Sequence, residues 1–201
     1  MEGVSAIDRA LVLPPGFRAL PGEGDAWRTA LRAAALGVEP GAVFWDGAHG
    51  RCRAAFVFAP DRPLGDGGFM LDLGALALFD AVAVLAPPQV PVHILTPDGL
   101  AVDGGRVATI RMAMAPCLED AIPEWAVLGI DVAIHAGTAA PGETPDQTCL
   151  AEEGFGDVTA ADVLIHGSRY LLGWLDEWRE GGAAALAQAV ALRTTTRAVA
   201  A

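Results

Sequence analysis

Strand-like segments joined by short turns are the feature that most constrains the fold of this chain of 201 residues. Residues 90–95, 100–102 and 106–115 lie at hairpin spacing, and residues 103–105 (Asp-Gly-Gly) form the turn between the last two. A further segment, 125–135, is as apolar as a central strand. Parallel neighbours need a long crossover connection, so strands linked this closely must be mostly antiparallel. The sequence therefore predicts an α+β fold with a mixed, mainly antiparallel sheet flanked by helices, and not a doubly wound parallel sheet.

Apolar residues at helical spacing predict helices on both sides of these strands. Asp25 is a favourable N-cap for the first helix, and Thr159 forms a capping-box pattern with Asp162 at the start of a later one. A glycine pair at 181–182 is expected to break the chain between the last two helices. The predicted helices span residues 25–36, 71–85, 160–180 and 183–192. Two more strands, 41–46 and 53–59, predict a second hairpin.

One domain accounts for most of the chain, because a chain of this length can bury a core without disulfides or metal. We expect residues 25–193 to form this domain. Residues 1–24, rich in proline and glycine, are expected to wrap its surface as an extended segment, and residues 194–201 to fray. Residues 136–158 are predicted to form a long polar loop, which in a compact domain is usually functional or mobile.

The composition excludes several classes of enzyme and partner. All 13 residues counted as Lys plus Arg are arginine, so the chain has no lysine for a Schiff base, a phosphate-binding P-loop or a buried general base. The formal net charge of -12 repels phosphate backbones and anionic lipids. Neither nucleic acid nor a membrane surface is therefore an expected partner.

The cysteines and the N-terminus indicate a cytoplasmic protein. Cys52, Cys117 and Cys149 are odd in number, far apart and without zinc-site spacing, which is typical of a reducing compartment. No secretory signal is visible at the N-terminus. The most apolar stretch, residues 73–97, is interrupted by Asp80 and by prolines, so it is not a membrane span.

Single residues give weak indications of chemistry, each with an ordinary structural alternative. His49 lies in a glycine turn and could face a ligand, although a surface histidine is the commoner explanation. His93 and His135 fall in strand-like segments and are interpreted as sheet residues rather than metal ligands. Cys149 could be a nucleophile near a histidine, or a buried structural thiol. Adjacent loop carboxylates could act as an acid and a base but usually form a solvated face: Glu152 and Glu153.

Four segments occur in an order that resembles biotin protein ligases. Residues 95–110 resemble the signature region, in which a Lys-Trp-Pro-Asn-Asp run opens a hairpin that closes into Lys-(apolar)-Ala-Gly-Ile. Residues 41–58 resemble the edge that carries a glycine- and arginine-rich nucleotide loop. Residues 125–132 resemble an apolar strand with a Gly-Ile-Asn turn, and residues 146–154 resemble a Thr-Ser-Leu-x-Glu-x-Gly segment. The resemblance covers roughly residues 25–190.

The resemblance implies the catalytic-domain fold of biotin and lipoate protein ligases, which is like that of class II synthetases. Those enzymes bind biotin or lipoate, form an acyl-adenylate from ATP with magnesium, and transfer the acyl group to a lysine of a carrier domain. It therefore implies a biotin- or lipoate-like acid as ligand, ATP and magnesium for an active enzyme, a biotinyl or lipoyl carrier domain as partner, and no tightly bound metal. A homodimer is a further possibility, because the small C-terminal β-domain of many such ligases is missing and leaves an edge strand.

The departures from the family pattern fall where its chemistry lies. The family's lysine aligns with Arg106, and the lysine of the Lys-Trp-Pro-Asn-Asp run aligns with Leu95. Asp98 and Gly99 stand at its Asn and Asp, and the basic loop is reduced to residues 47–51. An arginine can still hold a carboxylate or phosphate through two hydrogen bonds. Because guanidinium is larger and planar, the geometry for attack on the α-phosphate would change.

Two interpretations follow from this pattern. The first is a ligase-type enzyme in which Arg106 is the catalytic residue, with Arg51, Arg53 and Arg111 as further cations. The second is a non-catalytic module that binds a small molecule or a carrier domain on the same fold, because function resides in the site and not in the fold. The candidate ligand-binding residues are Trp45, Gly47, His49, Gly50, Arg51, Arg53, Asp98, Gly99, Thr109, Gly129 and Asp131.

Overall fold

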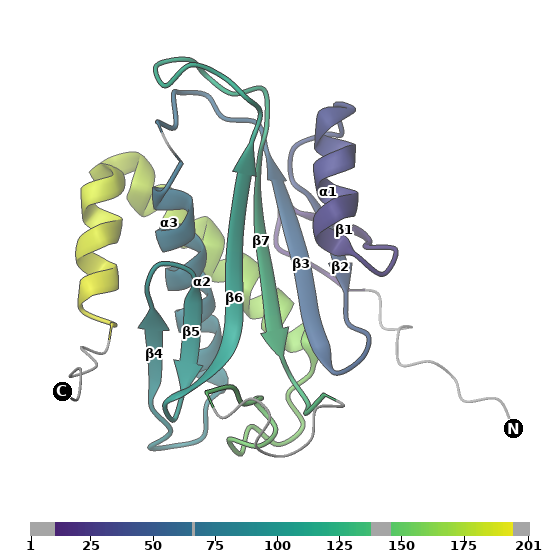
Figure 1. Ribbon diagram of the computed structural model, residues 1–201, viewed down its shortest axis with the longest axis vertical. Helices are drawn as coiled ribbons and strands as arrows, with labels where there is room; N and C mark the ends of the chain where they lie inside the picture. The colour runs from purple at the N-terminus through teal and green to yellow at the C-terminus, as the bar shows by residue number, and fades with distance from the viewer. Residues whose placement is uncertain (1–10, 66, 138–145, 195–201) are drawn as a thin grey trace, which may run out of the picture.

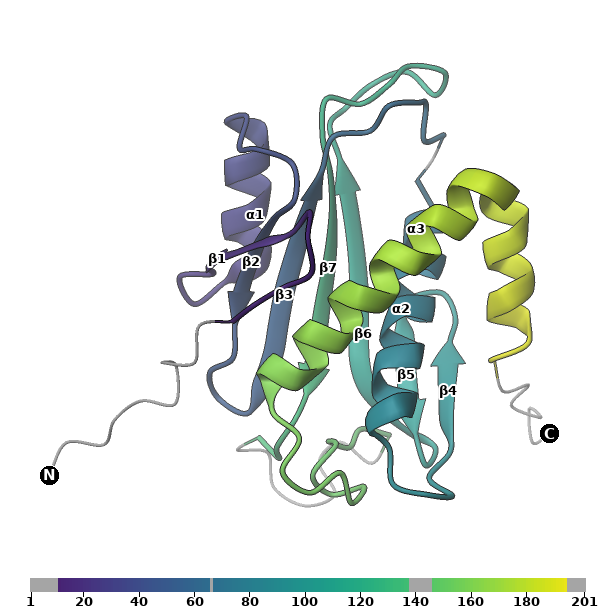
Figure 2. The same ribbon diagram turned by 180° about the vertical axis from the view of Figure 1, so that it is seen from behind.

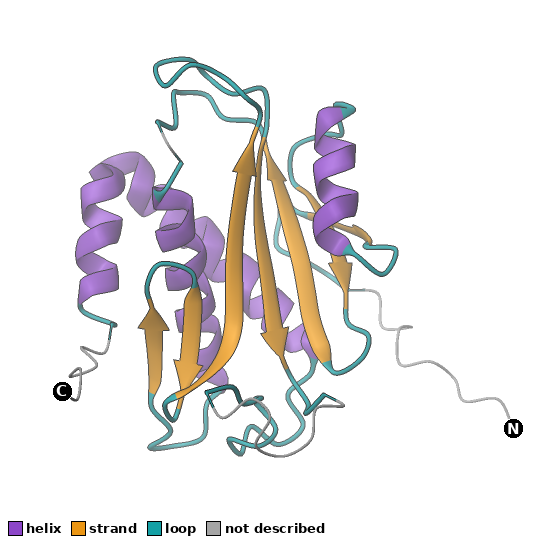
Figure 3. Ribbon diagram, in the orientation of Figure 1, coloured by secondary structure: helices purple, strands orange, loops and turns teal. Residues whose placement is uncertain are grey.

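The structure, a computed structural model, describes residues 11–65, 67–137 and 146–194. These residues form one seven-stranded sheet and three helices (Figure 1 and Figure 3). The strands are β1 (Arg18–Pro21), β2 (Ala42–Asp46), β3 (Arg51–Phe58), β4 (Val92–Leu95), β5 (Gly99–Val102), β6 (Gly105–Met114) and β7 (Ala126–Ala133). The helices are α1 (Ala26–Ala35), α2 (Phe69–Leu85) and α3 (Ala160–Ala191).

The sheet has the strand order β1-β2-β3-β7-β6-β5-β4. Only β1 and β2 run parallel, and all other neighbours in this sheet are antiparallel. The predicted fold class, α+β with a mixed and mainly antiparallel sheet, is therefore confirmed. The long central pair β6 and β7 is joined by a hairpin, while β3 reaches β7 across the sequence and closes the middle of the sheet.

The helices lie on both faces of the sheet, but unequally. Helices α2 and α3 pack against each other and cover one face, as Figure 2 shows. Helix α1 lies on the opposite face and contacts β2, β3 and β7 (Figure 1). Among the described residues, no helix covers β4, β5 and β6 on the side of the sheet that carries α1. We call the whole of this side, including the part that α1 contacts, the open face.

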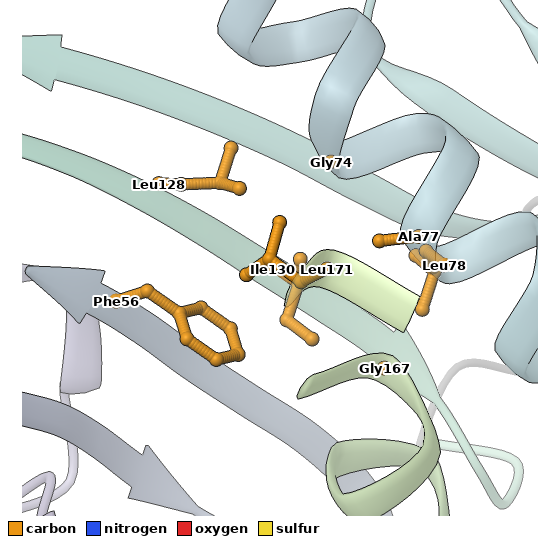
Figure 4. Close-up of a pocket in the computed structure, with 8 residues that line it drawn as sticks. All are labelled: Phe56, Gly74, Ala77, Leu78, Leu128, Ile130, Gly167 and Leu171. Atoms are coloured by element: carbon orange, nitrogen blue, oxygen red, sulfur yellow. The ribbon is translucent and has the colours of Figure 1, made fainter. Parts of the chain in front are cut away.

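The main core lies between the sheet and the pair α2–α3. Gly74 of α2 faces the sheet so closely that a Cβ atom there would come 2.9 Å from Ile110 Cγ2 and from Leu128 Cδ1. The glycine therefore lets the helix backbone approach the strands. A void of about 10 Å³ remains between Phe56, Leu128 and Ile130 of the sheet and the two helices (Figure 4). It is apolar and has room for about one water molecule, so it is a packing defect and not a ligand site.

The two ends of the described chain depart from the sequence-based expectation. Residues 18–21 were expected to be part of a surface segment, but they form the edge strand β1 next to β2. Thr194 was expected to fray, but it forms a bridge with Ile94 of β4, and the Ile94 N–H donates to the Arg193 carbonyl at 3.0 Å. Arg193 lies over the rings of Phe79 and Trp174. Ile94 and Phe79 lie about a hundred positions earlier in the chain, so local composition does not reveal these contacts. Residues 1–10 and 195–201 lie outside the described residues.

The predicted helix boundaries are largely confirmed. The N-cap Asp25 accepts a hydrogen bond from the Arg28 N–H, and Thr159 with Asp162 forms the predicted capping box. The predicted break near residue 181 is a kink at Gly182, whose φ of 68° lies in the left-handed region. Within the described ranges, no helix is both long and apolar enough to cross a membrane.

Candidate binding site on the open face

Five residues in direct register form a row across the open face. Gly99 pairs with Thr109, Thr109 with Asp131, Asp131 with Arg53, and Arg53 with Asp46. Residues paired directly across strands project to the same side of a sheet, so all five lie on the face that carries α1. We call these five positions the polar row. It brings together four of the predicted ligand-binding residues from β3, β5, β6 and β7.

One end of the polar row is an ion-pair network. The Arg51 Nε–H donates to Asp131 Oδ1 at 2.7 Å, and Arg53 Nε lies 3.8 Å from Asp131 Oδ2. Arg53 Nη1 lies 3.6 Å from Asp46 Oδ2. These side chains are half-buried, so their charges are screened less than those of surface pairs, and each fixes the orientation of the next. The sequence analysis missed Asp46, although its position opposite Arg53 in the predicted hairpin was a usable signal.

Arg106 lies at the other end of the polar row. Its guanidinium lies against Gly99, where a Cβ atom would come 2.7 Å from Arg106 Cζ. Arg106 Nη1 lies 3.4 Å from Asp98 Oδ1, a long contact between partly exposed groups. A register shift between β5 and β6 at Leu100 and Ala101 precedes the pair of Ala101 with Arg106. Such irregularities commonly redirect a side chain next to a site.

The segment after residue 145 fixes the backbone of Arg106. The Arg106 N–H donates to the Asp146 carbonyl at 2.8 Å, and the Thr148 N–H donates to the Arg106 carbonyl at 3.1 Å. The described part of the predicted 136–158 loop is therefore attached to the sheet at this point, whereas residues 138–145 lie outside the described residues. The Thr148 hydroxyl in turn donates to Glu153 Oε1 at 2.6 Å. The pair Glu152-Glu153 thus serves as a local hydrogen-bond acceptor, away from the polar row.

Trp27 of α1 borders the polar row on its α1 side. Its ring lies against Gly129 of β7, where a Cβ atom would come 2.6 Å from Trp27 Cε3. Arg111 of β6, which pairs with Gly129, places its guanidinium 5.2 Å from the centroid of the same ring. The sequence analysis placed Gly129 in the site and Trp27 only on the apolar stripe of a helix. The structure brings the two together.

Four predicted ligand-binding residues lie elsewhere. Trp45 is packed on the core side of the sheet, where its ring faces Gly47 and the start of α3. Its neighbour Asp46 points to the open face because successive strand residues alternate. Gly47, His49 and Gly50 form the turn between β2 and β3, with His49 exposed and the Gly50 carbonyl accepting from the N–H groups of residues 134 and 135. The turn therefore lies beyond the end of the polar row, next to Arg51.

The remaining single-residue candidates are accounted for structurally. Cys149 is buried, and burial raises the pKa of its thiol above the ordinary value, so it is held in the non-nucleophilic form. The alternative of a structural thiol is the one that this environment favours. His93 lies in β4, half-buried, as predicted, whereas His135 lies just beyond β7 and is exposed, so its prediction as a strand residue was wrong.

Charged side chains of both signs lie on the open face. Arg51, Arg53 and Arg106 face Asp46, Asp98 and Asp131. This set fits one carboxylate or one phosphate that engages a guanidinium. Arg111 adds a fourth guanidinium to this face, next to Trp27. Among the residues that the structure describes, no group of three or more His, Cys, Asp or Glu able to hold a metal occurs.

Comparison with known proteins identifies the family. Residues 13–191 match the Biotin/lipoate A/B protein ligase family, and the chain belongs to that family. A biotin protein ligase-like protein of unknown function from Silicibacter sp. TM1040 is similar to it in structure, with a TM-score of 0.81 and 32% identity over 91% of this chain and 80% of that one. A search of the curated proteins gave no match.

Biotin protein ligases share the fold at lower identity. The apo enzyme from Aquifex aeolicus aligns with a TM-score of 0.68 and 14% identity, over 83% of this chain and 73% of that one. The enzyme from Leishmania major in complex with biotinyl-5-AMP aligns with a TM-score of 0.58 and 16% identity, over 90% and 82%. The predicted resemblance is thus confirmed: this is a divergent member of the family, and it has no lysine at the position of the family's lysine or anywhere else.

Proposed function

We propose that this protein binds a biotin- or lipoate-like carboxylic acid, or the adenylate of such an acid, on the open face between Arg106 and the polar row. Its family and its fold favour this ligand class. The candidate residues on the sheet itself, Gly99, Thr109, Asp131 and Arg53, are in direct register with one another.

The proposal rests on the ion-pair contacts of the Arg106 guanidinium, compared with those of Arg51 and Arg53. Arg51 and Arg53 are engaged by Asp131 and Asp46, with contacts of 2.7–3.8 Å. Arg106 differs in its partner: its 3.4 Å contact is to Asp98, whose side chain is 42% exposed, whereas those of Asp46 and Asp131 are 14% and 20% exposed. A carboxylate or phosphate can take over this contact and make two parallel hydrogen bonds with the planar guanidinium. Because Gly99 has no side chain, the Arg106 guanidinium itself lies against the backbone of β5, at the end of the polar row.

ATP-dependent ligation is the second candidate, and membership of a ligase family favours it. In that reaction ATP supplies the adenylyl group that activates the acid. Arg106 would orient the acid or its adenylate and hold its negative charge, and the charge of arginine does not titrate under ordinary conditions. A biotinyl or lipoyl carrier domain would then be the acceptor, and the cytoplasm remains our predicted location. A homodimer also remains a prediction.

Calorimetric titration of the full chain tests the proposal. The ligands are biotin, lipoate, octanoate and a non-hydrolysable analogue of each acyl-adenylate. Binding of at least one of them supports the proposed function, and its absence for all of them overturns it. Pyrophosphate release with ATP, magnesium and the best-bound acid separates the two candidates. Release that is lost in Arg106→Met indicates a ligase, whereas tight binding without release indicates a binding module.

A further inference from the structure

At Trp27 and Gly129, a large side chain of α1 packs on a glycine of β7, which is unlike the packing next to them. Elsewhere beneath α1, small alanines of the helix, such as Ala30, belong to one cluster with alanine and valine side chains of the sheet, such as Ala55 and Val127. At Trp27 the helix contributes its largest side chain, and the sheet contributes a glycine that is itself buried. The ring therefore fills the space above β7 that a side chain at residue 129 would otherwise occupy.

The ring lies at a defined distance from Arg106. Gly99, beneath the Arg106 guanidinium, and Gly129, beneath the Trp27 ring, are two strands and two residues apart in register. With strands about 4.8 Å apart and a rise of about 3.4 Å per residue, these two positions are separated by about 12 Å along the open face. That separation is close to the extended length of a medium-chain carboxylic acid. The line between them crosses β6 between Thr109, which pairs with Gly99, and Arg111, which pairs with Gly129.

We propose that Trp27, held in place by Arg111, is the end wall of the acid site and limits the length of the acyl chain that the site accepts. This inference rests on the proposed function, because it assumes that the acid's carboxylate engages Arg106. The chain then runs from Arg106 obliquely across β6, between Thr109 and Arg111, until it meets the Trp27 ring over Gly129. Arg111 stacks on that ring at 5.2 Å and itself remains exposed, so it holds the ring without closing the row. Trp27 is thus a specificity-determining residue and not a catalytic one.

Affinities for a series of unbranched carboxylic acids of increasing length test this wall. The proteins compared are the wild type, Trp27→Ala, Arg111→Met and the control Trp125→Ala. Trp125 packs on the same α1 cluster as Trp27 but lies just before the start of β7. Trp27→Ala should shift the best-bound chain length to longer acids and change the ratio of long-chain to short-chain affinity by about tenfold or more. Trp125→Ala should leave that ratio unchanged, and Arg111→Met should broaden the preference.

A uniform loss of affinity for all acids in Trp27→Ala would overturn the inference, because it would indicate a structural role. If Trp27→Ala does not fold, Trp27→Leu must show the same direction of shift in chain length. Different results would contradict acid binding itself and the role of Trp27 as the end wall. A wild-type protein that binds no acid of any length contradicts the proposed function, whereas a wild-type protein that binds acids with a length preference independent of residue 27 contradicts only the wall.

Discussion

Arg106 of β6 occupies the space that a side chain at residue 99 would need. The Arg106 Cζ atom would come 2.7 Å from a Cβ atom at position 99 of β5, which is well inside van der Waals contact. The position of the Arg106 guanidinium therefore requires a glycine at residue 99. The guanidinium lies against the β5 backbone at Gly99, at the end of the polar row.

Gly99→Ala should weaken acid binding with little effect on stability. The added methyl group would displace the far end of a flexible side chain, so the fold can accommodate it, but the guanidinium would leave its position. We expect the affinity for the best-bound acid to fall by about tenfold, the loss of roughly one charge-assisted hydrogen bond. Calorimetry measures the affinity, and urea denaturation the free energy of unfolding. Gly173→Ala on α3, with no atom within 4 Å of the new Cβ, is the control that should bind normally.

Asp131→Ala should destabilise the protein more than loss of an ordinary surface carboxylate. Asp131 holds both Arg51 and Arg53, and its removal leaves two half-buried guanidinium groups with less compensation. We expect the free energy of unfolding to fall by about 1–3 kcal/mol, between the values for exposed and buried pairs. Asp61→Ala, which breaks an exposed contact with Arg62, should change the free energy of unfolding much less than Asp131→Ala does. Equal effects of the two substitutions would show that the network does not stabilise the sheet.

Stability should fall between pH 9 and 12 because of Cys52. Burial, reinforced by the charge of Asp131, raises the pKa of the Cys52 thiol from 9.0 to about 12. Over this interval the unfolded chain has lost the proton that the folded protein retains, so rising pH favours unfolding by up to about 1.4 kcal/mol per pH unit. The chain has no lysine and one tyrosine, so few other side chains titrate there.

Urea denaturation at several alkaline pH values measures this dependence. Cys52→Ala should have a shallower decline of the free energy of unfolding, with the remaining slope expected from Cys149, whose pKa is raised in the same direction. Cys117→Ala removes an exposed thiol and should retain the wild-type slope. An unchanged slope in Cys52→Ala would contradict the assignment.

Local signals in the sequence were sufficient for most of the elements. The Asp-Gly-Gly turn at 103–105 and the capping box at Thr159 depend on neighbouring residues, and both are present in the fold. Strand β1 was missed because it is short and its partner β2 lies beyond α1 in the sequence. The attachment of Arg193 was missed because it depends on Phe79, Asp80 and Trp174 from two other helices.

Four of the candidate residues lie together in the polar row, but the sequence does not show how they are arranged. Alternation along β2 requires Trp45 and Asp46 to point to opposite faces, but the sequence does not reveal which face α2 and α3 cover. Trp45 was therefore assigned to the site in place of Asp46. Trp27 was read from its helical spacing alone, and its contact with Gly129 depends on the way α1 packs across β7. Register across five strands, which no single segment encodes, is what joins Gly99 to Asp46.

The affinity of Arg106→Met for the best-bound acid tests whether the carboxylate of the acid binds at Arg106. Methionine keeps an unbranched side chain but removes the guanidinium. We expect Arg106→Met to bind the acid at least about tenfold more weakly than the wild type in calorimetry, because the charge-assisted pair is lost. The control Arg62→Met, at an exposed arginine paired with Asp61, should bind like the wild type. Equal affinities of Arg106→Met and the wild type would contradict the placement of the acid at Arg106.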